Sequence, residues 1–231
     1  MNRTSELLSK VEAEKRKSLL ETEAKDICLE CGIPVTKFRL AVTEADAIAF
    51  ADDIAYPVVL KVVSPDVVHK SEVGGVIVNL ENANQVQNAY RKILANVRRS
   101  KPDARIEGLL VEEMSPPSTE VIVGSHRDLQ FGPTLMFGLG GIFVEILKDV
   151  TFRIAPVTES EAMEMISEVK AYPLLKGYRN TPPVDIGSIV QILLSVSRLV
   201  TEHPQIAEID LNPILVYEIG AKVVDARIIL Q

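Results

Sequence analysis

The sequence predicts an α+β protein of two α/β lobes, preceded by an N-terminal helix. Residues 22–105 alternate between helix-like and strand-like segments, strand-like segments outnumber helix-like ones in residues 106–231, and residues 1–21 form a charged helical stretch. Many short strands in sequence favour antiparallel pairing in the second half. We therefore expect an N-terminal helical extension over 1–21, a first lobe over 22–105 and a second lobe over 106–231.

Composition restricts the class of protein before any motif is considered. The chain has 231 residues, of which 47% are hydrophobic and 25% are charged, as is typical of a globular chain with a sizeable core. A formal net charge of −7 argues against nucleic acid or an anionic membrane as a partner. The sequence has no apolar run that could span a bilayer and no signal-peptide pattern. We expect a cytoplasmic protein.

Two cysteines, Cys28 and Cys31, have the spacing C-x-x-C. Redox pairs and halves of zinc sites share this spacing, but there is no second cysteine pair and the three histidines are distant in sequence. We expect two packed thiols in a reducing compartment.

Periodicity, caps and breakers define the elements of the first lobe. The long N-terminal helix should end at Gly32-Ile33-Pro34, and only its second half carries apolar residues at docking spacing. The expected elements are a helix over 4–31, a strand over 35–41, a helix over 43–54 capped by Thr43, a strand around Lys61, a strand over 76–80 and a one-sided apolar helix over 82–99.

The second lobe is read in the same way, with turns marked by proline and glycine. Its expected strands lie over 106–114, 119–125, 134–137, 152–156, 206–216 and 222–230, and its expected helices lie over 159–169 and 186–202.

The stretch from 56 to 78 contains the first candidate site. Lys61 lies within an apolar run, and a buried ammonium group is unfavourable unless an anion meets it. His69 and Lys70 follow in the connection, and Gly74-Gly75 would let the backbone approach a ligand closely. These groups could gather around one triphosphate. An edge-strand lysine that reaches water and a basic surface turn explain the same residues.

A glycine-rich turn lies at Gly138, Gly140 and Gly141. It is not the dinucleotide fingerprint, because position 143 is Phe, and no Walker loop follows. A tight turn is the simplest interpretation.

Charged residues follow this turn. Glu145, Asp149 and Arg153 could face the same cavity, and the planar guanidinium of Arg153 suits a phosphate. A surface ion pair explains these residues almost as well.

The end of the chain contains a candidate metal site. Asp210 and Asn212 are two apart on a strand and therefore share a face. Symmetric pairing about the turn at Gly220 would set Asp225 opposite Ile214, diagonal to Asn212. Two carboxylates and an amide oxygen suit magnesium.

The strand end at Glu112, Glu113 and Met114 precedes two prolines, which suggests a hinge between the lobes. Backbone groups there could pair with an adenine edge, and Glu120 could accept ribose hydroxyls. An ordinary acidic strand end is the alternative.

In this order the segments resemble an ATP-grasp domain, and more narrowly the β subunit of NDP-forming acyl-CoA synthetases, the ADP-forming acetyl-CoA synthetase group related to succinyl-CoA synthetase. The matching segments are GIPVTKFRLA, YPVVLKVVSPDVVHKSEVGGV, LLVEEM, EVIVGSHRDLQFGPTLMFGLGGIFVEILKDVTFRIAP, IDLNPILV and VVDARI, and the match extends from Thr22 nearly to the end. HKSEVGG and FGPTLMFGLGG are specific to this group, whereas DLNP is a looser signature of the superfamily.

The resemblance implies a nucleotide bound between the two lobes and a role for each matching residue. Lys61 would hold the α-side phosphates. Glu112, Met114 and Glu120 would hold adenine and ribose, and Gly138, Gly140, Gly141 and Arg153 would cover the terminal phosphates. Asn212 and Asp225, with Asp210 nearby, would bind Mg²⁺, and His69 would be a transient phosphate carrier.

The resemblance also implies a partner and a reaction. An α subunit would carry the CoA-binding domain and a phosphohistidine, in an α2β2 assembly, and acyl-CoA, ADP and phosphate would give acid, CoA and ATP. Leu139, Ile142 and Phe143 are candidate partner contacts or core residues. Two alternatives remain: another ATP-grasp ligase that joins a carboxylate to an amine, and a non-catalytic nucleotide-sensing module.

Overall fold

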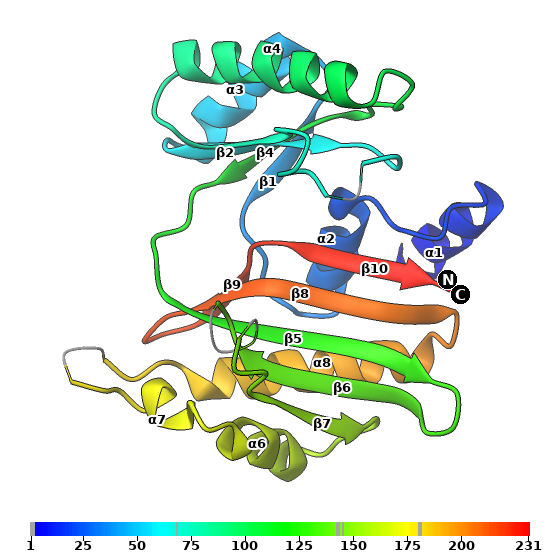
Figure 1. Ribbon diagram of the computed structural model, residues 1–231, viewed down its shortest axis with the longest axis vertical. Coiled ribbons are helices and arrows are strands. Elements are labelled where there is room, and N and C mark those ends of the chain that lie inside the picture. Colours follow the sequence, from blue (N-terminus) through cyan, green and yellow to red (C-terminus); the bar gives the residue numbers. More distant parts are fainter. Residues whose placement is uncertain (1–2, 68, 142–143, 145, 180–181) are drawn as a thin grey trace. The chain divides into compact units, whose positions relative to one another are not determined.

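The computed structural model describes residues 3–67, 69–141, 144, 146–179 and 182–231 (Figure 1). Its helices are α1 (Arg3–Ala13), α2 (Glu21–Glu30), α3 (Glu44–Ile54), α4 (Ala83–Ser100), α6 (Glu159–Glu168), α7 (Tyr172–Leu175) and α8 (Ile186–Glu202). Its strands are β1 (Phe38–Ala41), β2 (Val58–Val63), β3 (Val76–Leu80), β4 (Gly108–Glu113), β5 (Thr119–Asp128), β6 (Gly132–Leu139), β7 (Val150–Ile154), β8 (Ile206–Val216), β9 (Ala221–Val223) and β10 (Ala226–Leu230). Helices with antiparallel sheets confirm the predicted α+β class. Within the described ranges, no helix has both the length and the apolar character needed to cross a membrane.

The chain forms two compact units, each with its own apolar core. Unit 1 comprises Met1–Leu19, Glu23–Val35 and Pro117–Gln231, and unit 2 comprises Leu20–Thr22 and Thr36–Pro116. These boundaries differ from the expected ones, because the strand expected to open the second lobe, β4, lies in the unit 2 sheet. Its pairing with β1 and β2 joins segments far apart in sequence, which periodicity does not reveal.

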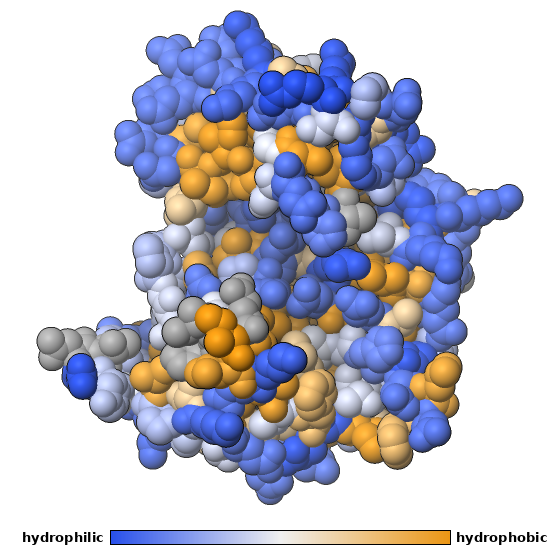
Figure 2. Space-filling model, in the orientation of Figure 1, coloured by the Kyte–Doolittle hydropathy of each residue, from blue (hydrophilic) through white to orange (hydrophobic). Residues whose placement is uncertain are grey.

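Unit 2 is a four-stranded antiparallel sheet in the order β1-β4-β2-β3, with α3 and α4 packed against it. All residues of β2 are buried, because this strand lies between two others. Helix α4 buries the predicted stripe that runs from Val86 to Val97, and the surface over α4 is predominantly hydrophilic (Figure 2). Helix α3 begins with a capping box formed by Thr43 and Asp46, which confirms the predicted cap.

Unit 1 contains a larger antiparallel sheet in the order β10-β8-β5-β6-β7, with β9 paired to β8. Helices α6 and α8 pack on one face of this sheet, where alternate residues such as Val123, Leu135 and Phe137 are fully buried (Figure 1). Leu139 belongs to the same core, which settles the choice between core and partner contact for this residue. Ile142 and Phe143, the other two candidate contacts, and Glu145 lie outside the described residues.

The N-terminal segment differs from the single helix predicted over 4–31. Helix α1 ends near Lys15, which has a left-handed φ of 55°. The following segment joins the edge of the sheet, since Leu19 N donates to Ile228 O at 3.0 Å and Leu230 N donates to Lys17 O at 2.7 Å. The expectation of an undocked first half was also wrong, because Leu8 and Val11 of α1 are fully buried in the unit 1 core.

The two cysteines are free thiols, and Cys28 is buried in the unit 1 core. Burial raises the pKa of the Cys28 thiol to about 12 and also raises the pKa of Cys31. Both side chains are therefore neutral thiols near pH 7 rather than reactive thiolates.

Candidate functional site

Lys61 lies at the centre of a buried charge cluster in unit 2. Its ammonium nitrogen lies 2.8 Å from Glu21 Oε1 and 2.7 Å from Glu112 Oε2, and the three side chains are 7%, 1% and 1% exposed. The hydroxyl of Thr36 donates to the other oxygen of Glu112. Anions do meet this buried lysine, and they are two carboxylates of the protein, whereas its contact with nucleotide phosphates stays a prediction.

The loop after β2 brings a second lysine to the same cluster. Lys70 Nζ lies 3.0 Å from Glu21 Oε2, so that one carboxylate contacts two ammonium groups. The backbone carbonyl of Lys70 accepts from Gly75 N at 2.8 Å. His69, the residue before Lys70, is exposed. The structure thus brings Lys61 and Lys70 together, and the neighbouring imidazole is accessible.

Gly74 and Gly75 have structural reasons for being glycine that do not involve a ligand. A Cβ on Gly75 would lie 2.6 Å from Val62 Cγ1 and 2.9 Å from the Lys70 carbonyl oxygen. Gly74 has a φ of +64°, and a Cβ there would lie 2.7 Å from Asn96 Nδ2. The pair is therefore required by the packing of the loop itself.

The predicted hinge residues lie at the end of β4. The Glu112 carboxylate is held by Lys61 and Thr36, so its observed role is to pair with a lysine. Glu113 N donates to Lys37 O at 3.0 Å, and Met114 N donates to Pro57 O at 3.1 Å. The Met114 carbonyl is therefore the backbone group to consider for an adenine edge.

In unit 1 the glycine-rich turn lies beside Glu120. Gly140 N donates to Glu120 O at 2.8 Å, and a Cβ on Gly140 would lie 2.8 Å from Glu120 Cβ. Gly138 packs equally closely on Val150, whose Cγ1 would be 2.9 Å from an added Cβ. Gly141 has a φ of +61° and open space at its Cβ position. Exposed Glu120 and this turn are thus neighbours on one sheet.

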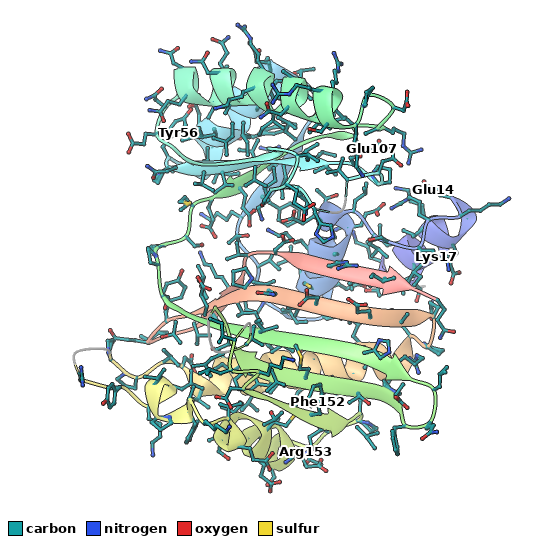
Figure 3. All side chains as sticks on the ribbon, viewed as in Figure 1. Glu14, Lys17, Tyr56, Glu107, Phe152 and Arg153 are labelled. Atoms are coloured by element: carbon teal, nitrogen blue, oxygen red, sulfur yellow. The ribbon has the colours of Figure 1, made fainter. Side chains whose placement is uncertain are left out.

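Arg153 does not join this group. It pairs across the strands with Leu135, which is fully buried on the helix-covered face of the sheet, and its guanidinium lies 2.5 Å from Glu168 of α6. Phe152, labelled with Arg153 in Figure 3, pairs with Met136, and both line a pocket on the other face. The alternative of an ion pair therefore describes Arg153. Asp149 also has a structural role, since its carboxylate accepts from Lys170 N and Ala171 N at 2.9 and 2.8 Å.

The candidate metal ligands share the face of the unit 1 sheet that α6 and α8 leave uncovered. Asn212 N donates to Asp225 O at 3.1 Å, and Ile214 pairs with Val223, so Asp225 lies opposite Asn212 and not opposite Ile214 as expected. A shift of two residues preserves the face. Asp210, Asn212 and Asp225 therefore lie on one side of the sheet, and the magnesium site predicted from them stays a prediction.

Burial and neighbouring charges determine the pKa of the Asp210 carboxylate. Burial and the nearby Glu208 raise its pKa, and Arg227 on the adjacent strand acts in the opposite direction. In the part of the chain that the structure describes, no group of three or more His, Cys, Asp or Glu residues could hold a metal ion. The candidate set has only two carboxylates, those of Asp210 and Asp225, and Asn212 is its third member.

A pocket of about 640 Å³ lies over this face of unit 1. Its lining combines apolar Ile122, Met136 and Phe152 with Asp210 and Asn212. Mostly apolar walls with a few polar groups are typical of small-molecule sites.

Sequence reasoning missed Glu21 and Thr36, which complete the cluster around Lys61. A signal for Glu21 exists, since an acid placed between Leu20 and Ala24 in a docked helix is a candidate for pairing. Nothing local identifies Lys61 as its partner, because the two residues are 40 positions apart.

Comparisons with known proteins agree with this geometry. The family profile described as an ATP-grasp domain matches residues 10–230. The subunit beta of acetate–CoA ligase (ADP-forming) I from Pyrococcus furiosus is 52% identical over 225 residues, which are 97% of this chain and 97% of that protein. Acetate–CoA ligase (ADP-forming) I from Archaeoglobus fulgidus is 53% identical over 199 residues, which are 86% of this chain and 29% of that protein.

A solved structure is similar over the same range. It is the acetyl-coenzyme A synthetase 1 of Ca. Korarchaeum cryptofilum in complex with coenzyme A, Ca-AMPCP and HgCl⁺, with a TM-score of 0.97 and 55% identity over 99% of this chain and 100% of that chain. The chain therefore belongs to the ATP-grasp family, and within it to the group of β subunits of ADP-forming acetyl-CoA synthetases. The resemblance inferred from the sequence motifs is confirmed.

Proposed function

We propose that this chain is the nucleotide-binding β subunit of an ADP-forming acyl-CoA synthetase. The net reaction converts acyl-CoA, ADP and phosphate to acid, CoA and ATP, reversibly. The observation that carries the proposal is the similarity to the Pyrococcus furiosus subunit, which extends over 97% of both chains at 52% identity.

Each unit contains its own candidate nucleotide contacts. Lys61 and Lys70 would supply cations for phosphates, the Met114 carbonyl would meet adenine, and the Glu112 side chain would hold Lys61 in place. In unit 1, Glu120 supplies a carboxylate for ribose, next to the turn of Gly138, Gly140 and Gly141, whose backbone amides suit the terminal phosphates. Arg153 is left out of this set because Glu168 holds it on the helix-covered face.

Mg²⁺ fits the oxygen ligands of Asp210, Asn212 and Asp225. The bound ion would neutralise charge that develops on the phosphates during transfer. Another solved structure of the same Korarchaeum protein contains Mg-AMPPCP, which supports magnesium as the metal. Asp210 and Asp225 would contribute the negative charge of the site, and Asn212 would complete it without adding charge.

His69 would carry the phosphoryl group between the partner and ADP. A neutral imidazole is a good nucleophile for phosphorus near neutral pH. A P–N bond to His69 would form as the P–N bond to the partner's phosphohistidine breaks, and ADP would then accept the group as the bond to His69 breaks. The exposure of His69, with Lys70 beside it, supports this role.

The proposed partner is an α subunit with the CoA-binding and phosphohistidine domains. The Pyrococcus furiosus protein that this chain matches over 97% of its length is named a subunit beta, which supports a partner subunit, and the chain matches 29% of the longer Archaeoglobus fulgidus protein. An α2β2 assembly in the cytoplasm, with neither nucleic acid nor membrane involved, completes the proposal.

The test is ATP formation from ADP, phosphate and acetyl-CoA by this chain with its α subunit, and by each alone. We expect ATP only from the mixture. His69→Ala should bind Mg-ADP normally and lose transfer, whereas Ser71→Ala, an exposed change in the same loop, should retain it. ATP formation by the His69→Ala complex at the wild-type rate would remove the carrier role. Mg-ADP binding without turnover on any acyl-CoA would instead favour the sensing module or an ATP-grasp ligase that joins a carboxylate to an amine.

A further inference from the structure

We propose that Glu21 is a positioning residue that fixes the loop carrying His69, an inference that rests on the phosphate-carrier role proposed above. Its carboxylate contacts two ammonium groups from different parts of unit 2. Oε1 lies 2.8 Å from Lys61 Nζ in the central strand β2, and Oε2 lies 3.0 Å from Lys70 Nζ in the loop. One side chain thus links the central strand of the sheet to Lys70, the residue that follows His69.

The sheet end of this link is firmly held. Lys61 is 7% exposed and is also paired with Glu112 at 2.7 Å, and Glu112 accepts the hydroxyl of Thr36. Ion pairs are electrostatically stronger where water is excluded. Lys61 therefore gives the Glu21 carboxylate a defined position, and Lys70 of the loop contacts the other oxygen of that carboxylate.

The loop end is held at two points of the same residue. The Lys70 carbonyl accepts from Gly75 N at 2.8 Å, and Gly75 O in turn accepts from Val62 N of β2 at 2.8 Å. The Lys70 ammonium is held by Glu21, and its side chain is only 18% exposed. Since consecutive Cα atoms lie about 3.8 Å apart, a fixed Lys70 restricts where His69 can lie.

This restriction matters for a two-step transfer. The His69 nitrogen must reach the phosphorus of the donor and later present it to ADP, and each step requires close approach and alignment. A misplacement of about 1 Å can lower such a rate about a hundredfold.

The chain offers a matched control for Glu21. Glu23 is 6% exposed, compared with 5% for Glu21, and it also contacts two cations, Arg16 at 2.9 Å and Lys10 at 3.1 Å. These contacts lie in unit 1 and do not involve the loop. A general effect of removing a buried carboxylate should appear in both Glu21→Gln and Glu23→Gln. An effect on the loop should appear only in Glu21→Gln.

The first measurement needs no turnover. Hydrogen–deuterium exchange of residues 69–75, and of the Gly75 amide above all, should be faster in Glu21→Gln than in wild type and unchanged in Glu23→Gln. Exchange that is the same in wild type and Glu21→Gln would overturn the proposal. Lys70→Met, which removes only the loop end of the link, should accelerate the same amides and serves if Glu21→Gln does not fold.

The second measurement uses the complex with the α subunit and rapid quenching of ³²P-labelled His69. Glu21→Gln and Lys70→Met should slow labelling about tenfold to a hundredfold. The KM for ADP in Glu21→Gln should change less than about threefold, because Lys61 keeps Glu112, and Glu23→Gln should label at the wild-type rate. Labelling at the wild-type rate in both Glu21→Gln and Lys70→Met would overturn the proposal. Failure of the wild-type complex to make ATP would instead remove the proposed function, while the exchange result would still decide whether Glu21 holds the loop.

Discussion

The two units hold their candidate site residues in different surroundings. In unit 2, Lys61, Glu21 and Glu112 are each less than a tenth exposed and are joined as ion pairs. In unit 1, Asp210, Asn212 and Asp225 are partly or fully exposed on the sheet face opposite the apolar core. The candidate site charges around Lys61 are therefore part of the fold of unit 2, whereas the candidate metal ligands of unit 1 lie outside its core.

This difference predicts which substitutions should change the stability of the protein and which should change only ligand binding. A buried ion pair that loses one partner leaves an uncompensated charge in a medium of low dielectric. A charge on an open sheet face returns to water at little cost. Substitutions matched between the two units can separate these effects.

The largest expected effect is that of Lys61→Met, which keeps the side-chain volume and removes the charge. Glu21 and Glu112 would lose a shared cation while each is 1% exposed, so the free energy of unfolding of unit 2 should fall by about 3–5 kcal/mol. Urea unfolding followed by hydrogen exchange of β2 and β4 measures this loss. Lys92→Met, an exposed change on α4, should stay within about 0.5 kcal/mol of wild type. Equal stability of the two variants would show that the cluster is not structural.

A smaller effect is expected from glycine substitutions that add only a methyl group. Gly75→Ala in unit 2 would place a Cβ 2.6 Å from Val62 Cγ1 and 2.9 Å from a backbone oxygen, and should destabilise by about 1–3 kcal/mol. Gly124→Ala in unit 1 meets its nearest atoms at 3.3 and 3.4 Å, and should cost less than about 1 kcal/mol. Thermal unfolding of both variants tests the contrast, and a larger loss at Gly124 would reverse it.

The sequence predicted what depends on local pattern. The stripe of α4, the cap at Thr43 and the shared face of Asp210 and Asn212 follow from periods of 3.6 and 2 and from cap chemistry, and the structure has all three. The register at Asp225 was wrong by two residues, because the position of a turn cannot be fixed by pattern alone.

Features that depend on distant pairing were missed. The link between Lys61 and Glu21 joins residues 40 positions apart, and the place of β4 depends on two strands that precede it. The family resemblance implied a phosphate role for Arg153, but its strand register turns it to the helix-covered face. Long-range register, which determines these three features, leaves no periodic trace in one sequence.

The smallest effect is expected for the Arg153–Glu168 pair of unit 1. The two side chains are 27% and 49% exposed, so Arg153→Ala should lower the free energy of unfolding by less than about 1 kcal/mol despite the 2.5 Å contact. Because Arg153 lies on the helix-covered face, it should also leave ATP formation by the complex close to the wild-type rate. Glu168→Ala removes the same ion pair without touching the arginine and should give the same small loss in urea unfolding. The contrary outcome is that ATP formation is lost in Arg153→Ala and retained in Glu168→Ala. That outcome would mean that the Arg153 guanidinium leaves Glu168 to reach phosphate during turnover. The separation of structural charges from ligand-binding charges in unit 1 would then fail at Arg153.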